Sequence, residues 1–225
     1  MDDRLHTIFR LAVEDYISTG NPVGSQYLVD RYKLDMSPAT IRNWFADLEE
    51  AGYLMQPHTS GGRIPTEEGF RHYAQTCITP KPLSKRQHAL LEQALGVSKE
   101  EGMHWKVAAK ALAEQASMAV LVGLARNETF YTGLSQLFSQ PEFQNWKHVV
   151  SLSEVLDRLD DALVRVRSTS YPEPVVLVGR DCPFGVMCST VMLTVDNTWI
   201  ALLGPQRMDY QAAYSSLSTL KQLYG

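Results

Sequence analysis

Two adjacent side chains, Arg42 and Asn43, have the chemistry to read the edges of DNA bases. In a major groove, a guanidinium forms paired hydrogen bonds with guanine, and a carboxamide forms them with adenine. At the spacing of a helix, these residues share a face with Ala39 and Ala46, whose small side chains allow close approach. The pattern predicts a DNA recognition helix, and an ordinary amphipathic core helix is the alternative.

The segment around these residues has the signals that begin and end a helix. Ser37 can cap the first free N–H groups, Pro38 suits the first turn, and Gly52 can end the helix in a left-handed conformation. The opposite face is apolar and predicted to be buried: Ile41, Trp44, Phe45 and Leu48. The acids come late, at Asp47, Glu49 and Glu50, so entry by the N-terminal end would keep them away from phosphates.

Two further helices precede this segment. Apolar residues from Leu5 to Ile17 recur at helical spacing and predict a first helix that ends near Gly20. A second, short helix is predicted to begin at Ser25. Three helices with a short turn between the second and third are typical of a helix-turn-helix.

A predicted ribbon follows the third helix. The runs Tyr53–Gln56 and Arg63–Ile64 flank a glycine-containing tip, as expected for the two-stranded wing of a winged helix. Thr66 is predicted to cap a fourth helix. A winged helix that only docks other proteins is the alternative to one that binds DNA. The predicted DNA-contacting residues are Ser25, Gln26, Ser37, Ala39, Thr40, Arg42, Asn43, His58, Thr59, Ser60 and Arg63.

The second part of the chain reads as helices flanking an antiparallel sheet, which gives an α+β fold class. We expect a domain over residues 1–78, a proline-containing linker over 79–84 and a second domain over 85–225. The predicted helices are Arg86–Leu95, Val107–Ser117, Ser151–Val166 and one capped by Asp209, and the predicted strands are Met118–Leu124, Val175–Gly179, Val186–Val195 and Thr198–Gly204.

Charge and composition limit the mode of binding. The chain has 225 residues and a formal net charge of −4, and seven Lys and Arg oppose eleven acids in residues 1–75. Binding would depend on a local arrangement of Arg31, Lys33, Arg42 and Arg63, with weak non-specific affinity and modest salt dependence. The sequence contains no long apolar run or signal peptide, which predicts a cytoplasmic protein without a membrane partner.

No pattern of catalytic residues emerges, so we predict a protein that is not an enzyme and has no cofactor or metal site. Cys182 and Cys188 match no redox or zinc spacing and are predicted to be buried thiols. Arg207 and Asp209 flank a tight turn before a helix. A structural turn is one interpretation of this pair, and a small-ligand or partner site is the other.

Several long motifs resemble the heat-inducible transcription repressor family HrcA. Trp44-Phe45 and Gly61 depart from the usual family residues. The matching segments are Val13–Ile17, Pro22–Ser25, Ser37–Asn43, Ala46–Glu50, Gln56–Thr66, Gly133–Ser135, Gln140–Phe143 and Gly204–Tyr210.

The resemblance implies a winged helix-turn-helix followed by a GAF-like antiparallel-sheet domain. It also implies a repressor of heat-shock (chaperone) operons that binds an inverted-repeat operator in double-stranded DNA as a homodimer, is released on heat stress and responds to a GroE-type chaperonin. Family members carry an inserted dimerisation domain where this chain has only Ala125–Glu128, so the mode of dimerisation is open. The alternative function is a small-molecule-sensing winged-helix regulator whose GAF-like domain holds the ligand.

Overall fold

The computed structural model describes residues 2–57, 61–97, 102–124, 128–143, 166 and 169–225. The chain divides into two compact units, Met1–Cys77 and Ile78–Gly225. No helix in the described ranges combines the length and the apolar character needed to cross a membrane.

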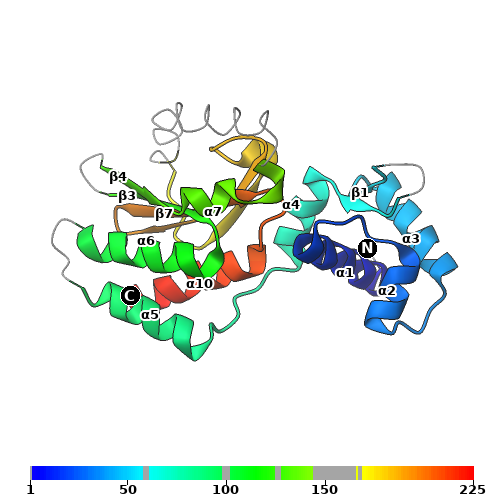
Figure 1. Ribbon diagram of the computed structural model, residues 1–225, viewed down its shortest axis with the longest axis horizontal. Coiled ribbons are helices and arrows are strands. Elements are labelled where there is room, and N and C mark those ends of the chain that lie inside the picture. Colours follow the sequence, from blue (N-terminus) through cyan, green and yellow to red (C-terminus); the bar gives the residue numbers. More distant parts are fainter. Residues whose placement is uncertain (1, 58–60, 98–101, 125–127, 144–165, 167–168) are drawn as a thin grey trace. The chain divides into compact units, whose positions relative to one another are not determined.

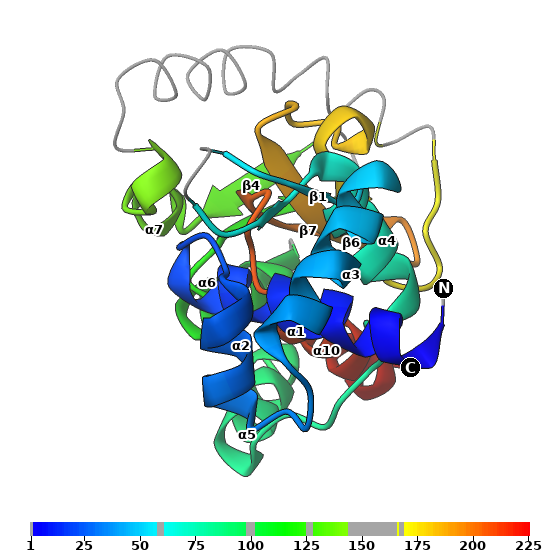
Figure 2. The ribbon, with the colours of Figure 1, turned by 90° about the vertical axis from the view of Figure 1, so that its right-hand side faces the viewer.

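The first unit is a winged helix-turn-helix, as predicted (Figure 1). Helix α3 contacts α1, α2 and β1, and these neighbours can be followed in Figure 2. The core between them includes the fully buried Phe9, Leu28 and Ile41. The elements are α1 (Asp3–Thr19), α2 (Ser25–Tyr32), α3 (Pro38–Glu50), β1 (Leu54–Met55), β2 (Ile64–Pro65) and α4 (Glu67–Thr76).

Local signals set the helix ends of this unit. The Ser37 hydroxyl accepts the Thr40 N–H at 3.1 Å, and the Thr66 hydroxyl accepts the Gly69 N–H at 2.9 Å. Gly20 and Gly52 follow α1 and α3 with φ of 69° and 78°, a left-handed conformation that glycine adopts without strain. The predicted start and stop of helix α3 are therefore confirmed.

The wing is shorter than predicted. Leu54 pairs with Pro65 and Met55 with Ile64, so each strand has two residues. The backbone of Arg63 pairs instead with Val23, in the loop before α2. The predicted tip residues His58, Thr59 and Ser60 lie outside the described residues.

The second unit is built on a five-stranded antiparallel sheet with the strand order β4-β3-β7-β6-β5. Asp196 and Asn197 join β6 to β7 in a hairpin, as predicted. The elements are α5 (Lys85–Leu95), α6 (Met103–Ala116), β3 (Ala119–Gly123), β4 (Thr129–Thr132), α7 (Leu134–Phe138), η3 (Pro141–Phe143), β5 (Val175–Val178), η4 (Gly179–Asp181), β6 (Cys188–Val195), β7 (Thr198–Pro205) and α10 (Tyr210–Tyr224).

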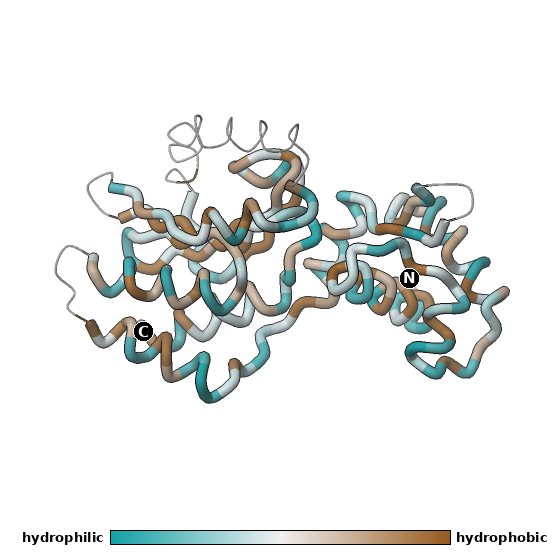
Figure 3. Tube along the Cα trace, viewed as in Figure 1, coloured by the Kyte–Doolittle hydropathy of each residue, from teal (hydrophilic) through white to brown (hydrophobic). Residues whose placement is uncertain are grey.

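Both faces of this sheet are covered. Every residue of β7 is buried, although successive side chains of a strand point to opposite faces. Helices α6 and α10 pack on one face, with α5 against both helices, and Figure 1 shows all three on one side. On the other face, Leu121, Met192 and Ala201 form an apolar cluster with Leu137 and Phe143. Figure 3 shows apolar residues along the central strands.

Several elements of this unit differ from the sequence-based prediction. Helix α6 begins at Met103, four residues before the predicted start, and α5 begins at Lys85 behind a capping box of Ser84 and Gln87. Strand β4 and helix α7 were not predicted, because both are too short for a clear periodic pattern. The helix predicted over Ser151–Val166 falls outside the described residues, apart from Val166.

Candidate nucleic-acid interface

Helix α3 presents the predicted polar face to solvent. Ala39, Arg42 and Asn43 are exposed, whereas Ile41 and Phe45 are buried on the other side. The Arg42 Nε lies 3.5 Å from the Pro38 carbonyl, so the side chain runs toward the N-terminal end of the helix. This arrangement offers one guanidinium and one carboxamide from a rigid, capped helix, which is what base recognition in a major groove requires.

Small hydroxyls border this face at the start of α3. The Ser37 and Thr40 hydroxyls lie 2.9 Å apart, and Ser37 also caps the helix. A hydroxyl has one hydrogen to donate, and one of these two donates it to the other, so one hydroxyl of the pair retains a donor for a phosphate oxygen. Ser37 and Thr40 thus lie at the end of α3 toward which the Arg42 side chain runs.

The other predicted backbone contacts lie at the start of α2. Ser25 is half-buried, and the exposed Gln26 donates from Nε2 to Asp30 Oδ1 at 2.9 Å. In the described structure, no side chain caps this helix at Gly24. The first N–H groups of α2 can therefore serve an anion at the helix N-terminus.

Arg63, which the sequence predicts to hold phosphates, forms an ion pair within the first unit. Its Nε lies 2.8 Å from Glu49 Oε2, and only 19% of its side chain is exposed. The Nε–H has no aligned acceptor, so the contact is an ion pair and not a directed hydrogen bond. Sequence reasoning missed this pairing because the two partners are fourteen positions apart, with the wing between them.

Most cations of the first unit are paired with its own carboxylates. Among the described residues the pairs are Arg10–Glu14, Arg31–Asp15, Arg63–Glu49, Arg71–Glu67 and Arg71–Glu68. The same part of the structure shows no ion pair for Arg4, Lys33 or Arg42. The predicted group of Arg31, Lys33, Arg42 and Arg63 is therefore not a set of four unpaired charges.

A buried carboxylate on α1 holds two side chains of α2. Asp15 is 2% exposed, and its Oδ1 accepts the Tyr27 hydroxyl at 3.2 Å and lies 2.9 Å from Arg31 Nε. Desolvation and this hydrogen bond raise the pKa of Tyr27. The Arg31 guanidinium also lies 5.8 Å from the centre of the Tyr27 ring. One feature of the sequence could have indicated these contacts: an acidic residue lies between Ala12 and Tyr16, among the apolar positions of an amphipathic helix.

Arg207 and Asp209, predicted to form either a structural turn or a ligand or partner site, both bond to other residues of the second unit. Arg207 forms an ion pair with Glu142 of η3. Asp209 caps α10 by accepting the Ala212 N–H at 2.9 Å. Both side chains therefore stabilise a turn, which favours the structural interpretation of this segment.

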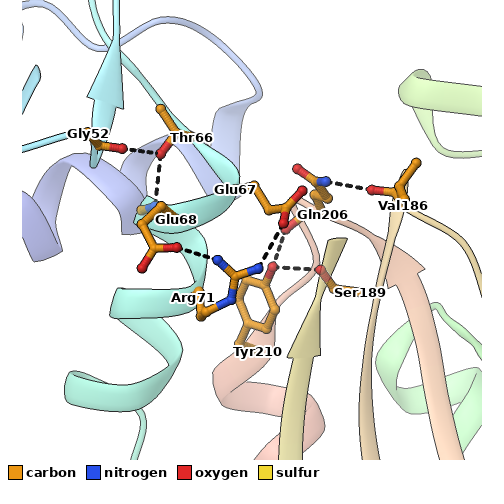
Figure 4. Close-up of polar contacts among 10 residues, drawn as sticks. Gly52, Thr66, Glu67, Glu68, Arg71, Val186, Ser189, Gln206 and Tyr210 are labelled. Carbon is orange, nitrogen blue, oxygen red and sulfur yellow. Dashed lines mark hydrogen bonds and ion pairs between the residues drawn. The ribbon is translucent and has the colours of Figure 1, made fainter. Parts of the chain in front are cut away.

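Two hydroxyls next to this turn belong to a chain of hydrogen bonds that runs from the interior toward the surface, drawn in Figure 4. The Tyr210 and Ser189 hydroxyls lie 2.9 Å apart, and Tyr210 donates to the Gln206 carbonyl. Gln206 Nε2 donates to the Val186 carbonyl at 2.7 Å. Figure 4 also draws contacts of the first unit, in which Arg71 bonds Glu67 and Glu68 and Thr66 bonds the Gly52 carbonyl.

The cysteines of the second unit are poor nucleophiles. Cys182 and Cys188 are buried, and burial raises the pKa of Cys182 and raises that of Cys188 to about 12. Among the residues whose positions are described, no three histidine, cysteine or acidic side chains are grouped as a metal would require.

The chain was compared with proteins of known structure. It aligns with a crystal structure described as that of a hypothetical protein, with a TM-score of 0.77 and 18% identity, covering 100% of this chain and 98% of the other. At this identity the similarity shows a shared fold and no more.

Sequence comparison gives relatives with a stated function. The chain is 50% identical over 95 residues to "Heat-inducible transcription repressor HrcA" of Thermobifida fusca, covering 42% of this chain and 28% of that protein. It is 48% identical over 93 residues to the protein of the same name from Pelotomaculum thermopropionicum, covering 41% and 27%. The chain thus matches little more than a quarter of the length of these relatives.

A family model gives the broader match. The model of the HrcA protein C terminal domain matches residues 66–213, which is more than half of the 225 residues and runs from the cap of α4 into α10. On this match, the chain belongs to the HrcA family.

Proposed function

We propose that this chain is a transcriptional repressor that binds a specific sequence in double-stranded DNA through its winged helix-turn-helix. The observation that carries the proposal is the exposed face of α3, where Arg42 and Asn43 project from a helix capped by Ser37. The names of the relatives, which are heat-inducible transcription repressors, support the same function. Nothing in this proposal requires catalysis.

We assign two kinds of contact to these residues, one to the base edges and one to the phosphates. Arg42 and Asn43 read base edges, with Ala39 and Thr40 beside them. Ser37 and the first turn of α2, at Ser25 and Gln26, hold the phosphates on either side. His58, Thr59 and Ser60 at the wing tip are proposed to reach the adjacent groove or backbone, on the sequence alone.

We further propose that two copies bind an inverted repeat as a symmetric dimer. A single α3 offers few base contacts, and a two-fold dimer doubles them and sets the spacing of the half-sites. On the family resemblance, the controlled genes are heat-shock (chaperone) operons, heat releases the repressor, and a GroE-type chaperonin is its partner.

The test is selection of DNA ligands from a random-sequence duplex pool with the full chain, followed by sedimentation with and without the selected duplex. We expect an inverted repeat bound by two copies. A chain that enriched no sequence would refute specific DNA binding. A chain that stayed monomeric on an enriched, non-repeated site would refute the dimeric arrangement alone.

A further inference from the structure

The segment that leads into β2, the second strand of the wing, is hydrogen-bonded through its backbone to the loop before α2. The Arg63 N–H donates to the Val23 carbonyl at 2.9 Å, and the Val23 N–H donates to the Arg63 carbonyl at 2.8 Å. A Cβ on Gly62 would lie 2.5 Å from the carbonyl carbon and oxygen of Val23, so only glycine permits this approach. The backbone therefore sets where the Arg63 side chain begins.

From that position the Arg63 side chain is directed to α3. Its Nε is 2.8 Å from Glu49 Oε2, and 30% of the Glu49 side chain is exposed. Both groups are largely shielded from water, which strengthens the attraction between opposite charges and raises the cost of separating them. A phosphate held by the other guanidinium nitrogens, Nη1 and Nη2, would lie close to the Glu49 carboxylate, whose negative charge would repel it.

Glu49 belongs to the helix that carries the proposed base-reading residues. It follows the buried Leu48 near the end of α3, two turns after Arg42 and Asn43. The ion pair thus connects the wing to the recognition helix. It also neutralises an acid on that helix, which would otherwise repel DNA.

We propose that Arg63 and Glu49 are positioning residues, which set the wing against α3 and do not contact DNA themselves. This inference rests on the proposed DNA-binding function. If Arg63 instead held a phosphate, Glu49 would compete with DNA for it, and removing the Glu49 charge would leave binding unchanged or tighten it. If the pair positions the wing, removing the same charge weakens binding. The two roles therefore predict different outcomes for one substitution.

The experiment measures affinity of the full chain for a duplex selected with the wild-type chain, over a series of salt concentrations. The variants are Glu49→Gln, Arg63→Gln and the exchanged pair Glu49→Arg with Arg63→Glu. Glu50→Gln is the matched control, because Glu50 is an exposed acid at the end of α3 without an ion pair among the described residues. Circular dichroism at the assay temperature verifies that each variant is folded.

We expect Glu49→Gln and Arg63→Gln each to weaken binding about three- to tenfold, with the salt dependence unchanged, and the exchanged pair to regain most of the loss. Glu50→Gln should bind no more weakly than wild type. Unchanged or tighter binding by Glu49→Gln would overturn the inference, as would a salt slope lowered by about one in Arg63→Gln, the signature of a lost phosphate contact. Arg42→Ala in the same series separates the two proposals: if it binds as tightly as wild type, base reading by α3 fails, whatever the ion pair does.

Discussion

Arg207, in the turn between β7 and α10, forms an ion pair with Glu142 of η3, 65 residues earlier in the chain. The Arg207 side chain is 14% exposed, and η3 also contributes the buried Phe143 to the apolar cluster on the sheet. Two sequence motifs of the family resemblance, Gln140–Phe143 and Gly204–Tyr210, therefore meet in the folded second unit.

Replacing Glu142 with Gln should destabilise the second unit, because the largely shielded Arg207 would lose its ion pair with this carboxylate. We expect the free energy of unfolding to fall by about 1 to 2 kcal/mol, the partial exposure of both groups keeping the loss below that of a fully buried pair. Urea unfolding of the single variants and of Glu142→Gln with Arg207→Gln measures the coupling. If the two losses add without coupling, the ion pair contributes nothing to stability.

Replacing Arg42 with alanine should weaken binding to the selected duplex by about 1 to 3 kcal/mol and relax the preference at one base position. The cause is loss of a paired hydrogen bond to one base. Arg10→Ala is the matched control, because Arg10 lies on α1 and is paired with Glu14, and it should leave the affinity unchanged. A gel-shift competition with single-base variants of the duplex tests both expectations, and an unchanged base preference in Arg42→Ala would contradict base reading.

The stability of the first unit should fall in mild acid because of His72. Burial, and then the charge of His6, lower the pKa of His72 from 6.5, and its ring stacks on Tyr53 with centroids 4.4 Å apart. The unfolded chain then binds more protons than the folded chain between the lowered pKa and 6.5, so the stabilisation is complete above this range and is lost as the pH falls through it.

Urea unfolding at pH 7.5 and 5.5 checks this prediction, with His72→Phe as the comparison because phenylalanine keeps the aromatic stacking. The wild-type chain should lose more stability than the variant on acidification. An equal loss in both would show that other groups cause the pH dependence.

Replacing Tyr210 with phenylalanine should cost about 1 to 3 kcal/mol, because Ser189 would keep a buried hydroxyl without its partner. Adding Ser189→Ala should recover part of this loss, since it removes the hydroxyl left unsatisfied. Thermal unfolding of the two single variants and the double variant gives the comparison. A double variant as unstable as the sum of both would show that the two hydroxyls act independently.

The features that could be predicted from the sequence are those determined by residues close to one another along the chain. Ser37, Thr66 and Asp209 each cap the helix that begins at the next residue, and the partner N–H lies three residues away. The face of α3 follows from the helical period alone, which is why the exposure of Arg42 and Asn43 was predictable.

Features that depend on distant partners were missed. Strand β4 has four residues and is defined by its pairing with β3, so it carries no distinctive pattern of its own. The pairing of Arg63 with Glu49 depends on how far the wing folds back, and that of Arg31 with Asp15 on the packing of α2 against α1. A count of charges along the sequence cannot show which of them neutralise one another.

The internal pairing of these charges has a consequence for how the proposed repressor would find its operator. A chromosome presents a vast excess of unrelated sites that compete with the operator for the protein. Their affinity for the protein comes mainly from its unpaired cations, which attract the phosphates. A winged helix whose arginines are largely committed to its own carboxylates would be held only briefly at those sites. A small number of copies would then suffice to keep the operator occupied, and any change that unpaired the arginines would divert the protein to the rest of the chromosome.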